Sequence, residues 1–293
     1  MIFRNIYTFF LVLSTGFLSA NSLQAQDDAP ISGIWGNWLA NHQTAELSPK
    51  GTTSMFMVHY FDQITANGIS DWFGIYGTSN IQMGFERTFG KDFSAFYHTE
   101  KLNKTHELGA RFQLTRQSLG DTSPVSSALS FSVSADTRNK KFFGDNFYFI
   151  NRFFFTTQLA VSRQISPRMQ VMSNTTFVHF NIVPNRAYSD FLAESFSLAW
   201  RANRKTSLYA SCDFPLGVAS AASADPQNPK PVYALGTILA TPTHNFQVFV
   251  SNANQISLGK EYLNNRSGFS LDALHIGFSI QVKFGKGKKT QPS

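Results

Sequence analysis

Residues 274–284 read Leu-His-Ile-Gly-Phe-Ser-Ile-Gln-Val-Lys-Phe, and this stretch decides the class of fold. Apolar side chains occupy every second position from Leu274 to Phe284, and the positions between them are polar or glycine. Alternation with a period of two is the pattern of a β-strand with one apolar and one polar face. The stretch therefore predicts a half-polar strand near the end of the chain.

The same alternation recurs along the chain and predicts about twelve strands. Most of the segments have the length that a tilted strand needs to cross a bilayer, about 9–11 residues. Two of them, 168–180 and 232–240, alternate poorly, so their faces stay open. The expected strands are centred near residues 52–61, 80–88, 92–100, 105–116, 125–136, 151–163, 168–180, 190–201, 205–214, 232–240, 244–252 and 273–284.

The connections between these segments are mostly short and long in turn. The short ones are Gly90-Lys91, Ser166-Pro167, Ala202-Asn203-Arg204 and Pro242-Thr243, which are typical turn sequences. The long ones are 62–79, 137–150, 181–189, 215–231 and 253–272, while 101–104 and 117–124 depart from the pattern. Short periplasmic turns and long outer loops are typical of a transmembrane barrel. We therefore expect a single-chain antiparallel transmembrane β-barrel in the bacterial outer membrane, with both termini periplasmic.

Composition excludes several other classes. Charged residues and aromatic residues each make up 15% of the 293 residues, and the formal net charge is +7. Disorder goes with few aromatics and high net charge, and a disulfide scaffold needs more than the single Cys212. A secreted β-sandwich is disfavoured because it has no reason to alternate short and long connections. A soluble lipocalin-like barrel is disfavoured because it is apolar inside and has about eight strands.

The polar faces of the expected strands carry too many charges for a dry core, because buried unpaired charges are costly. That cost disappears if these faces line a wet lumen and the apolar faces meet lipid. Two of the charges, Glu107 and Arg111, lie about 13 Å apart on one strand, so they cannot pair directly, but each could pair with a neighbouring strand. Such rows either form structural ion-pair ladders or give small solutes a polar path. The expected lumen-lining residues are Glu86, Glu100, Glu107, Arg111, Arg201, Asp213, His275 and Lys283.

The sequence divides into four parts. Residues 1–25 resemble a secretory signal peptide, with Arg4 before an apolar stretch from Tyr7 to Ala20. Residues 26–49 contain Trp35 and Trp38 without alternation, so this segment crosses the periplasmic mouth, plugs the lumen or is mobile. Residues 50–285 form the barrel domain, and 286–293 form a basic tail.

Four stretches of this chain together resemble a known family. They are 48–59 (Ser-Pro-Lys-Gly-Thr-Thr-Ser-Met-Phe-Met-Val-His), 72–86 (Trp-Phe-Gly-Ile-Tyr-Gly-Thr-Ser-Asn-Ile-Gln-Met-Gly-Phe-Glu), 244–255 (His-Asn-Phe-Gln-Val-Phe-Val-Ser-Asn-Ala-Asn-Gln) and 274–284. In this order they are similar to a family of single-chain Gram-negative outer-membrane β-barrels catalogued as a domain of unknown function. The family usually has His-Arg-Phe where this chain has His59-Tyr60-Phe61, and it often has an acidic residue near Tyr76-Gly77, where this chain has none. The resemblance implies an outer-membrane barrel and brings no activity with it.

The last strand also resembles the signal that the outer-membrane insertion machinery reads. The signal residues here are Gly277, Ile280, Val282 and Phe284, although a short tail follows Phe284. Aromatic residues near the expected strand ends are typical of the girdles at the two bilayer interfaces. These are Tyr60, Phe61, Phe89, Phe93, Phe214, Tyr233 and Phe284.

Three functions remain open on this evidence. The charged lumen favours a narrow pore or transport channel for small polar solutes. The long loops favour a non-conducting structural or binding barrel. A lipid-modifying enzyme would need a cluster such as His179 with Ser173 or Asn174, but no motif fixes their spacing and we expect no enzyme. The histidines are dispersed and Cys212 falls on an apolar face, so no metal site and no cofactor is expected. The expected partners are outer-membrane lipids, the insertion machinery and either a small solute or a loop-bound partner, with no nucleic acid.

Overall fold

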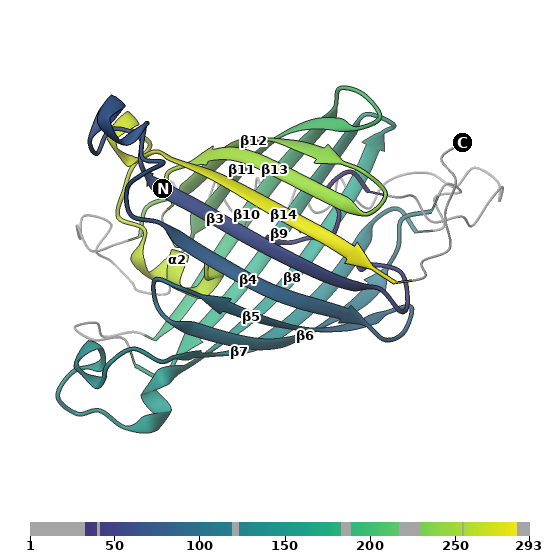
Figure 1. Cartoon of the computed structure of the whole chain (residues 1–293). Helices are drawn as coiled ribbons and strands as arrows, with labels where there is room; N and C mark the ends of the chain where they lie inside the picture. Colours follow the sequence, from purple (N-terminus) through teal and green to yellow (C-terminus); the bar gives the residue numbers. More distant parts are fainter. Residues whose placement is uncertain are drawn as a thin grey trace, which may run out of the picture.

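A computed structural model describes residues 33–39, 42–118, 123–182, 189–216, 229–253 and 255–285, and twelve antiparallel strands close it into a barrel (Figure 1). The first and last strands of the wall pair with each other, which completes the closure. The predicted fold and strand number are confirmed. The wall strands are β3 (Thr53–Gln63), β4 (Asn80–Thr88), β5 (Phe93–Glu100), β6 (Thr105–Thr115), β7 (Ser126–Asp136), β8 (Phe153–Ser166), β9 (Met169–Phe180), β10 (Asp190–Arg201), β11 (Thr206–Pro215), β12 (Val232–Ala240), β13 (His244–Ser251) and β14 (His275–Phe284).

The alternation places apolar side chains outside the barrel and mostly polar side chains inside. On β6, Leu108 is 60% exposed on the outer wall, whereas Arg111 is fully buried inside. On β14, His275, Ser279 and Gln281 are buried inside. An exposed apolar exterior on a closed barrel is stable only when lipid surrounds it. The side chains of the wall therefore face outward and inward as the sequence predicts.

The two ends of the barrel differ. One end, which we call the turn end, carries most of the tight turns together with the start of β3 and the end of β14, and it lies on the right in Figure 1. The other end, the loop end, carries every short helix of the described residues: η1 (Gly68–Asp71), η2 (Lys140–Phe143), η3 (Phe149–Arg152), α2 (Leu258–Asn264) and η4 (Leu271–Ala273). In the described part of the chain, no helix is long and apolar enough to span a membrane.

The barrel interior is filled rather than open. Residues 33–39 and 42–48 lie inside the lumen, where β1 (Trp38–Leu39) pairs with β2 (His42–Gln43) in a two-stranded sheet of its own. We call these residues the lumen hairpin. Side chains that face the lumen are almost completely buried, including Glu86 at 1%, Arg111 at 0% and Gln158 at 2% exposure. In a water-filled pore these side chains would be exposed, so the hairpin and the loop-end helix α2 fill the lumen.

Large rings inside the barrel explain one glycine of the expected assembly signal. A Cβ at Gly277 would lie 2.3 Å from Cε2 of Phe249, which covers this position from the neighbouring strand. Gly109 is covered in the same way by Phe96. Only glycine allows a ring to lie this close to the strand. Gly277 therefore has a packing role inside the barrel, whereas Ile280 and Val282 alternate with the buried inward positions and Phe284 is 52% exposed.

One of the expected girdle residues is misplaced. Tyr60 faces the lumen and is only 2% exposed, packed against Phe249, so its assignment to the bilayer interface is wrong. Phe89, Phe93 and Phe284 are exposed on the outside, as expected. The expected signal peptide (1–25) and basic tail (286–293) lie outside the described residues.

Candidate functional site

A buried ion pair on the wall holds the lumen hairpin. Arg111 on β6 donates from Nη1 to both carboxylate oxygens of Glu86 on β4, at 2.9 and 3.1 Å. The hairpin binds to this ion pair. Its residues Asn37 and Trp38 each donate to Glu86 Oε2 at 3.2 Å. In return, Arg111 Nη2 donates to the carbonyl oxygens of Thr44 at 2.6 Å and of Glu46 at 3.1 Å. Both residues were expected to line the lumen, and they do so as the docking point of the hairpin.

Amide side chains around the wall bind the backbone of the hairpin. Gln113 on β6 accepts from the Leu47 amide at 3.0 Å and donates to the Ala45 carbonyl at 2.7 Å. Asn245 and Gln247 on β13 donate to the carbonyls of Trp35 at 2.9 Å and Trp38 at 2.8 Å. These bonds satisfy backbone groups that would otherwise be buried without partners. The wall therefore recognises the hairpin mainly through side chains and not through a shared sheet.

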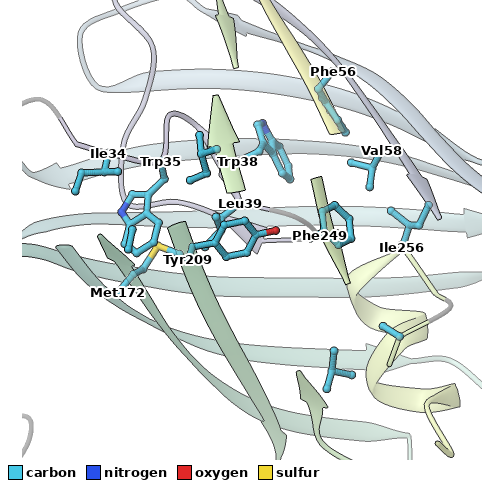
Figure 2. Close-up of a cluster of buried hydrophobic side chains, with 14 of the residues drawn as sticks. Ile34, Trp35, Trp38, Leu39, Phe56, Val58, Met172, Tyr209, Phe249 and Ile256 are labelled. Atoms are coloured by element: carbon cyan, nitrogen blue, oxygen red, sulfur yellow. The ribbon is translucent and has the colours of Figure 1, made fainter. Parts of the chain in front are cut away.

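Apolar side chains of the hairpin pack on an apolar patch of the inner wall (Figure 2). Trp38 stacks on Phe56 of β3 with ring centroids 4.8 Å apart. Trp35 and Leu39 are fully buried in the same cluster, next to Met172, Tyr209 and Phe249 of the wall. Burial of this apolar surface adds to the polar docking contacts.

The helix α2 closes the lumen from the loop end. Lys260 donates to Asp136 Oδ2 of β7 at 2.9 Å, and Arg138 binds the same oxygen at 2.6 Å. The Lys260 ammonium also lies over the rings of Phe154 and Phe180, at 5.2 and 5.3 Å. Burial lowers the pKa of Lys260 below 10.5, and the Asp136 carboxylate acts in the opposite direction. The positive charge of the buried Lys260 is therefore stabilised by the Asp136 carboxylate.

The tip of the hairpin meets α2 inside the barrel. His42 Nε2 lies 2.9 Å from Asp213 Oδ2 of β11, and both side chains are almost fully buried. One ligand atom each of His42, Asp213 and Glu261 of α2 lie within 4.8 Å of one another. A small cavity of ≈ 20 Å³ remains nearby, lined in part by Trp38, His98 and Glu107. A space of this size holds about one water molecule.

The other expected lumen residues lie at various depths. Glu100 faces inward and accepts from Asn80 at 2.7 Å and from Asn103 at 3.2 Å. Glu107 lies 3.4 Å from His98 of β5, so it pairs across strands and not with Arg111. Three others lie near the ends of the barrel. Arg201 donates to the Pro167 carbonyl at 3.3 Å at the turn end, Lys283 lies half-buried on β14, and the ring of His275 lies 2.9 Å from the Phe61 carbonyl at the loop end.

The structure does not assemble the enzyme cluster weighed in the sequence. His179 lies on the outer wall, where its Nδ1 is 2.6 Å from Asp190. Ser173 lies six positions away on the same strand, about 20 Å at strand spacing, and donates to Glu194. Asn174 faces the lumen and donates to the Gln43 carbonyl. A nucleophile needs its base within hydrogen-bond reach, so these residues do not form a catalytic unit.

A protein-family model matches residues 35–284, from the lumen hairpin to the end of the last wall strand. Its description is "Membrane bound beta barrel domain (DUF5777)". This chain belongs to that family. The family match confirms the resemblance expected from the sequence, and it covers both the barrel wall and the segment inside it. No curated protein sequence matches the chain.

Solved structures similar to this chain include outer-membrane channels. One is an outer membrane channel from Pseudomonas putida F1, with a TM-score of 0.52, 9% identity, and coverage of 82% of this chain and 97% of that chain. Another is the KdgM porin, with a TM-score of 0.47, 7% identity, and coverage of 80% of this chain and 99% of that chain. At these identities the likeness concerns the fold of this DUF5777 barrel.

Sequence reasoning kept a lumen plug as one of three alternatives for residues 26–49, but it did not identify which residues bind inside the lumen. Trp35 and Trp38 stood out as aromatic residues in a segment without alternation, but nothing in the sequence tied them to the wall. His42, Lys260 and Glu261 gave no signal, because their partners lie far away in the sequence. The metal-ligating types His42, Asp213 and Glu261 do come together, contrary to the expectation from dispersed histidines. Cys212 is half-buried on the face opposite the inward Asp213, as expected.

Proposed function

We propose that this protein is a channel of the bacterial outer membrane for small polar solutes, and that the lumen hairpin closes it. The observation that carries the proposal is that the hairpin lies inside the barrel without being part of its wall. Among the described strands, β1 pairs only with β2, while β3 to β14 close on each other. Release of the hairpin therefore leaves every strand pair of the wall intact.

The inner wall is suited to become a solute path when the hairpin leaves. The residues that bind the hairpin backbone, among them Arg111, Gln113 and Gln247, are charged or carry amides that water solvates well. With the hairpin docked they are buried and paired, and with the hairpin released they face an aqueous lumen. Rings of charged and polar side chains are the groups that select solutes in pores. The fold shared with outer-membrane channels supports this function.

The orientation and assembly of the barrel are part of the proposal. The turn end faces the periplasm, because periplasmic turns are short in these barrels and outer loops are long. The hairpin then enters the lumen from the periplasmic side, and α2 covers it from outside. Outer-membrane lipids surround the wall, and the insertion machinery reads the outward side chains of β14, Ile280, Val282 and Phe284. No chemical step on the solute is involved.

A non-conducting barrel is the second candidate, and the filled lumen favours it. In that case the hairpin is a permanent core, and the long loops at the loop end bind a partner. The two candidates differ in what happens when the hairpin is absent.

Solute permeation into liposomes tests the proposal. The complete chain and a chain that lacks residues 33–48 are reconstituted, and swelling is followed in isotonic solutions of a small sugar and of a small zwitterion. Heat-modifiable migration on a denaturing gel verifies that both barrels are folded. We expect slow swelling with the complete chain and rapid swelling without the hairpin. No swelling from a folded barrel that lacks the hairpin would overturn the channel and favour the non-conducting barrel.

A further inference from the structure

We propose that His42, Asp213 and Glu261 form a binding site for one divalent transition-metal ion, which joins the lumen hairpin to the wall and to α2. Each residue comes from a different structural unit: the hairpin, strand β11 and the loop-end helix. A metal bound here would tie the hairpin to the wall and to α2, from which the hairpin has to separate when the lumen opens. That consequence for gating rests on the proposed channel function, whereas the metal site itself does not.

The geometry is close to that of a metal centre. His42 Nε2 and Asp213 Oδ2 are 2.9 Å apart, and an atom of Glu261 completes a triangle with no side longer than 4.8 Å. Ligand atoms bound to one tetrahedral Zn²⁺ at about 2.0–2.1 Å are about 3.4 Å from one another. A small movement of the Glu261 side chain toward the other two ligand atoms, with a slight widening of the His42–Asp213 contact, brings the three atoms to that spacing.

A second observation points to a ligand at this place. His42 is 2% and Asp213 is 3% exposed, yet His42 Nδ1 and Asp213 Oδ1 are buried without a hydrogen-bond partner. A buried carboxylate oxygen without a donor is costly, because its desolvation is not compensated. Coordination of a cation by this carboxylate supplies the missing interaction.

Charge and ligand type select the metal. With a neutral imidazole the three side chains carry two negative charges, which one divalent cation balances. The ammonium of the neighbouring Lys260 binds Asp136 of β7 instead. An imidazole with carboxylates favours Zn²⁺ and similar ions over Ca²⁺ and Mg²⁺, and three protein ligands leave one position open for water.

Metal binding is tested on the complete chain, folded in detergent and free of affinity tag. Zn²⁺ is titrated in competition with a chromophoric chelator, and Co²⁺ is added separately because its visible absorption reports a four-coordinate site. The variants Asp213→Asn and Glu261→Gln keep the side-chain shapes and remove one carboxylate each. The matched control is Asp190→Asn, which removes the carboxylate of the outer-wall pair with His179. That pair has no third ligand type close enough to form a group of three in the described residues.

We expect one Zn²⁺ per chain, an affinity loss of at least about 100-fold in either site variant, and no change in the control. Because the parent chain is measured directly, its Co²⁺ spectrum decides the question even if a variant fails to fold: a four-coordinate band supports the site. Failure of the parent to bind Zn²⁺, or equal affinity in all variants, would overturn it.

Liposome swelling with and without Zn²⁺ separates this inference from the proposed function. If Zn²⁺ binds and slows swelling, both stand. If Zn²⁺ binds but the barrel lacking residues 33–48 never conducts, the metal site stands and the channel function fails. If that barrel conducts but the complete chain binds no metal, only the metal site fails.

Discussion

Replacement of Arg111 tests how the hairpin is held. Arg111→Gln leaves the Glu86 carboxylate buried without its guanidinium, and removes the donor to the carbonyls of Thr44 and Glu46. Loss of one partner of a buried ion pair costs about 3–5 kcal/mol. Both residues lie on the wall, so release of the hairpin brings water to Glu86 and relieves that cost. The substitution therefore penalises the docked state and not the released state.

The expected shift follows from this free energy. Each 1.4 kcal/mol changes an equilibrium tenfold, so Arg111→Gln raises the ratio of released to docked hairpin by roughly two to three and a half orders of magnitude. The reporter is a thiol introduced by Ala45→Cys in a Cys212→Ser background, because Ala45 is fully buried in the docked hairpin. When release and redocking are fast, the rate of maleimide labelling follows the released fraction.

The control and the refuting result are defined in the same assay. Arg138→Gln removes a guanidinium that binds Asp136 at the loop end, without a recorded hydrogen bond to the described hairpin, and is expected to leave labelling nearly unchanged. A labelling rate that is the same in Arg111→Gln as in the parent, with the barrel intact on a gel, would refute the role of the ion pair in docking.

Three further predictions use the same reporter or a simple proteolysis assay. Trp38→Ala removes the ring stacked on Phe56 and should favour release by about 3–5 kcal/mol, seen as faster labelling; unchanged labelling would contradict the apolar docking contact. Burial raises the pKa of Glu46 above 4.5, with opposing contributions led by its hydrogen bond to Gln170. The Glu46 carboxyl group thus binds its proton more tightly in the docked hairpin than in the released hairpin. Docking is therefore strongest at acidic pH and weakens as pH rises through the raised pKa. Labelling should accelerate with pH in the parent, after correction for thiol ionisation with a released control peptide, and Glu46→Gln should remove this part of the dependence. Lys260→Met leaves Asp136 with Arg138 alone and should make the segment around α2 more sensitive to protease added at the loop end; equal cleavage would show that this ion pair does not hold α2.

The wall of the barrel was predictable because its signal is local. In the last strand each outward side chain is followed by an inward one, so Phe278 and Ser279 take opposite faces whatever the rest of the chain does. The turn sequences set where each strand ends. The expected strands therefore overlap the observed ones along the whole barrel.

For the contents of the lumen the sequence left three alternatives open, one of them a plug, and it could not choose between them because the contacts are not local. The hairpin has no periodicity, and its partners, such as Gln247 for Trp38, lie far along the chain. The two weakly alternating strands now have a physical explanation. Met172 of β9 and Ile238 of β12 are inward apolar residues because they pack with the hairpin cluster, while Val178 of β9 packs in the cluster next to α2. An inner face that meets another part of the protein need not be polar.

The candidate site was predicted in its residue types and in the alternative of ion pairing, but not as the place where the hairpin docks. Glu86, Arg111 and Asp213 were placed correctly on the inner wall by alternation. They pair with one another and with the hairpin, so the row of charges, for which structural ion pairs and a solute path were both open, is buried and paired in this structure. Only the folded chain shows that these charges hold a segment in place.

The conductance of single barrels in a planar bilayer tests the central claim most directly. The complete chain is compared with the chain that lacks residues 33–48, at the same protein concentration and salt. We predict a silent or rarely open complete chain, and stable, uniform current steps from the chain without the hairpin. Identical current traces from the two folded proteins would contradict the claim that the hairpin closes the lumen.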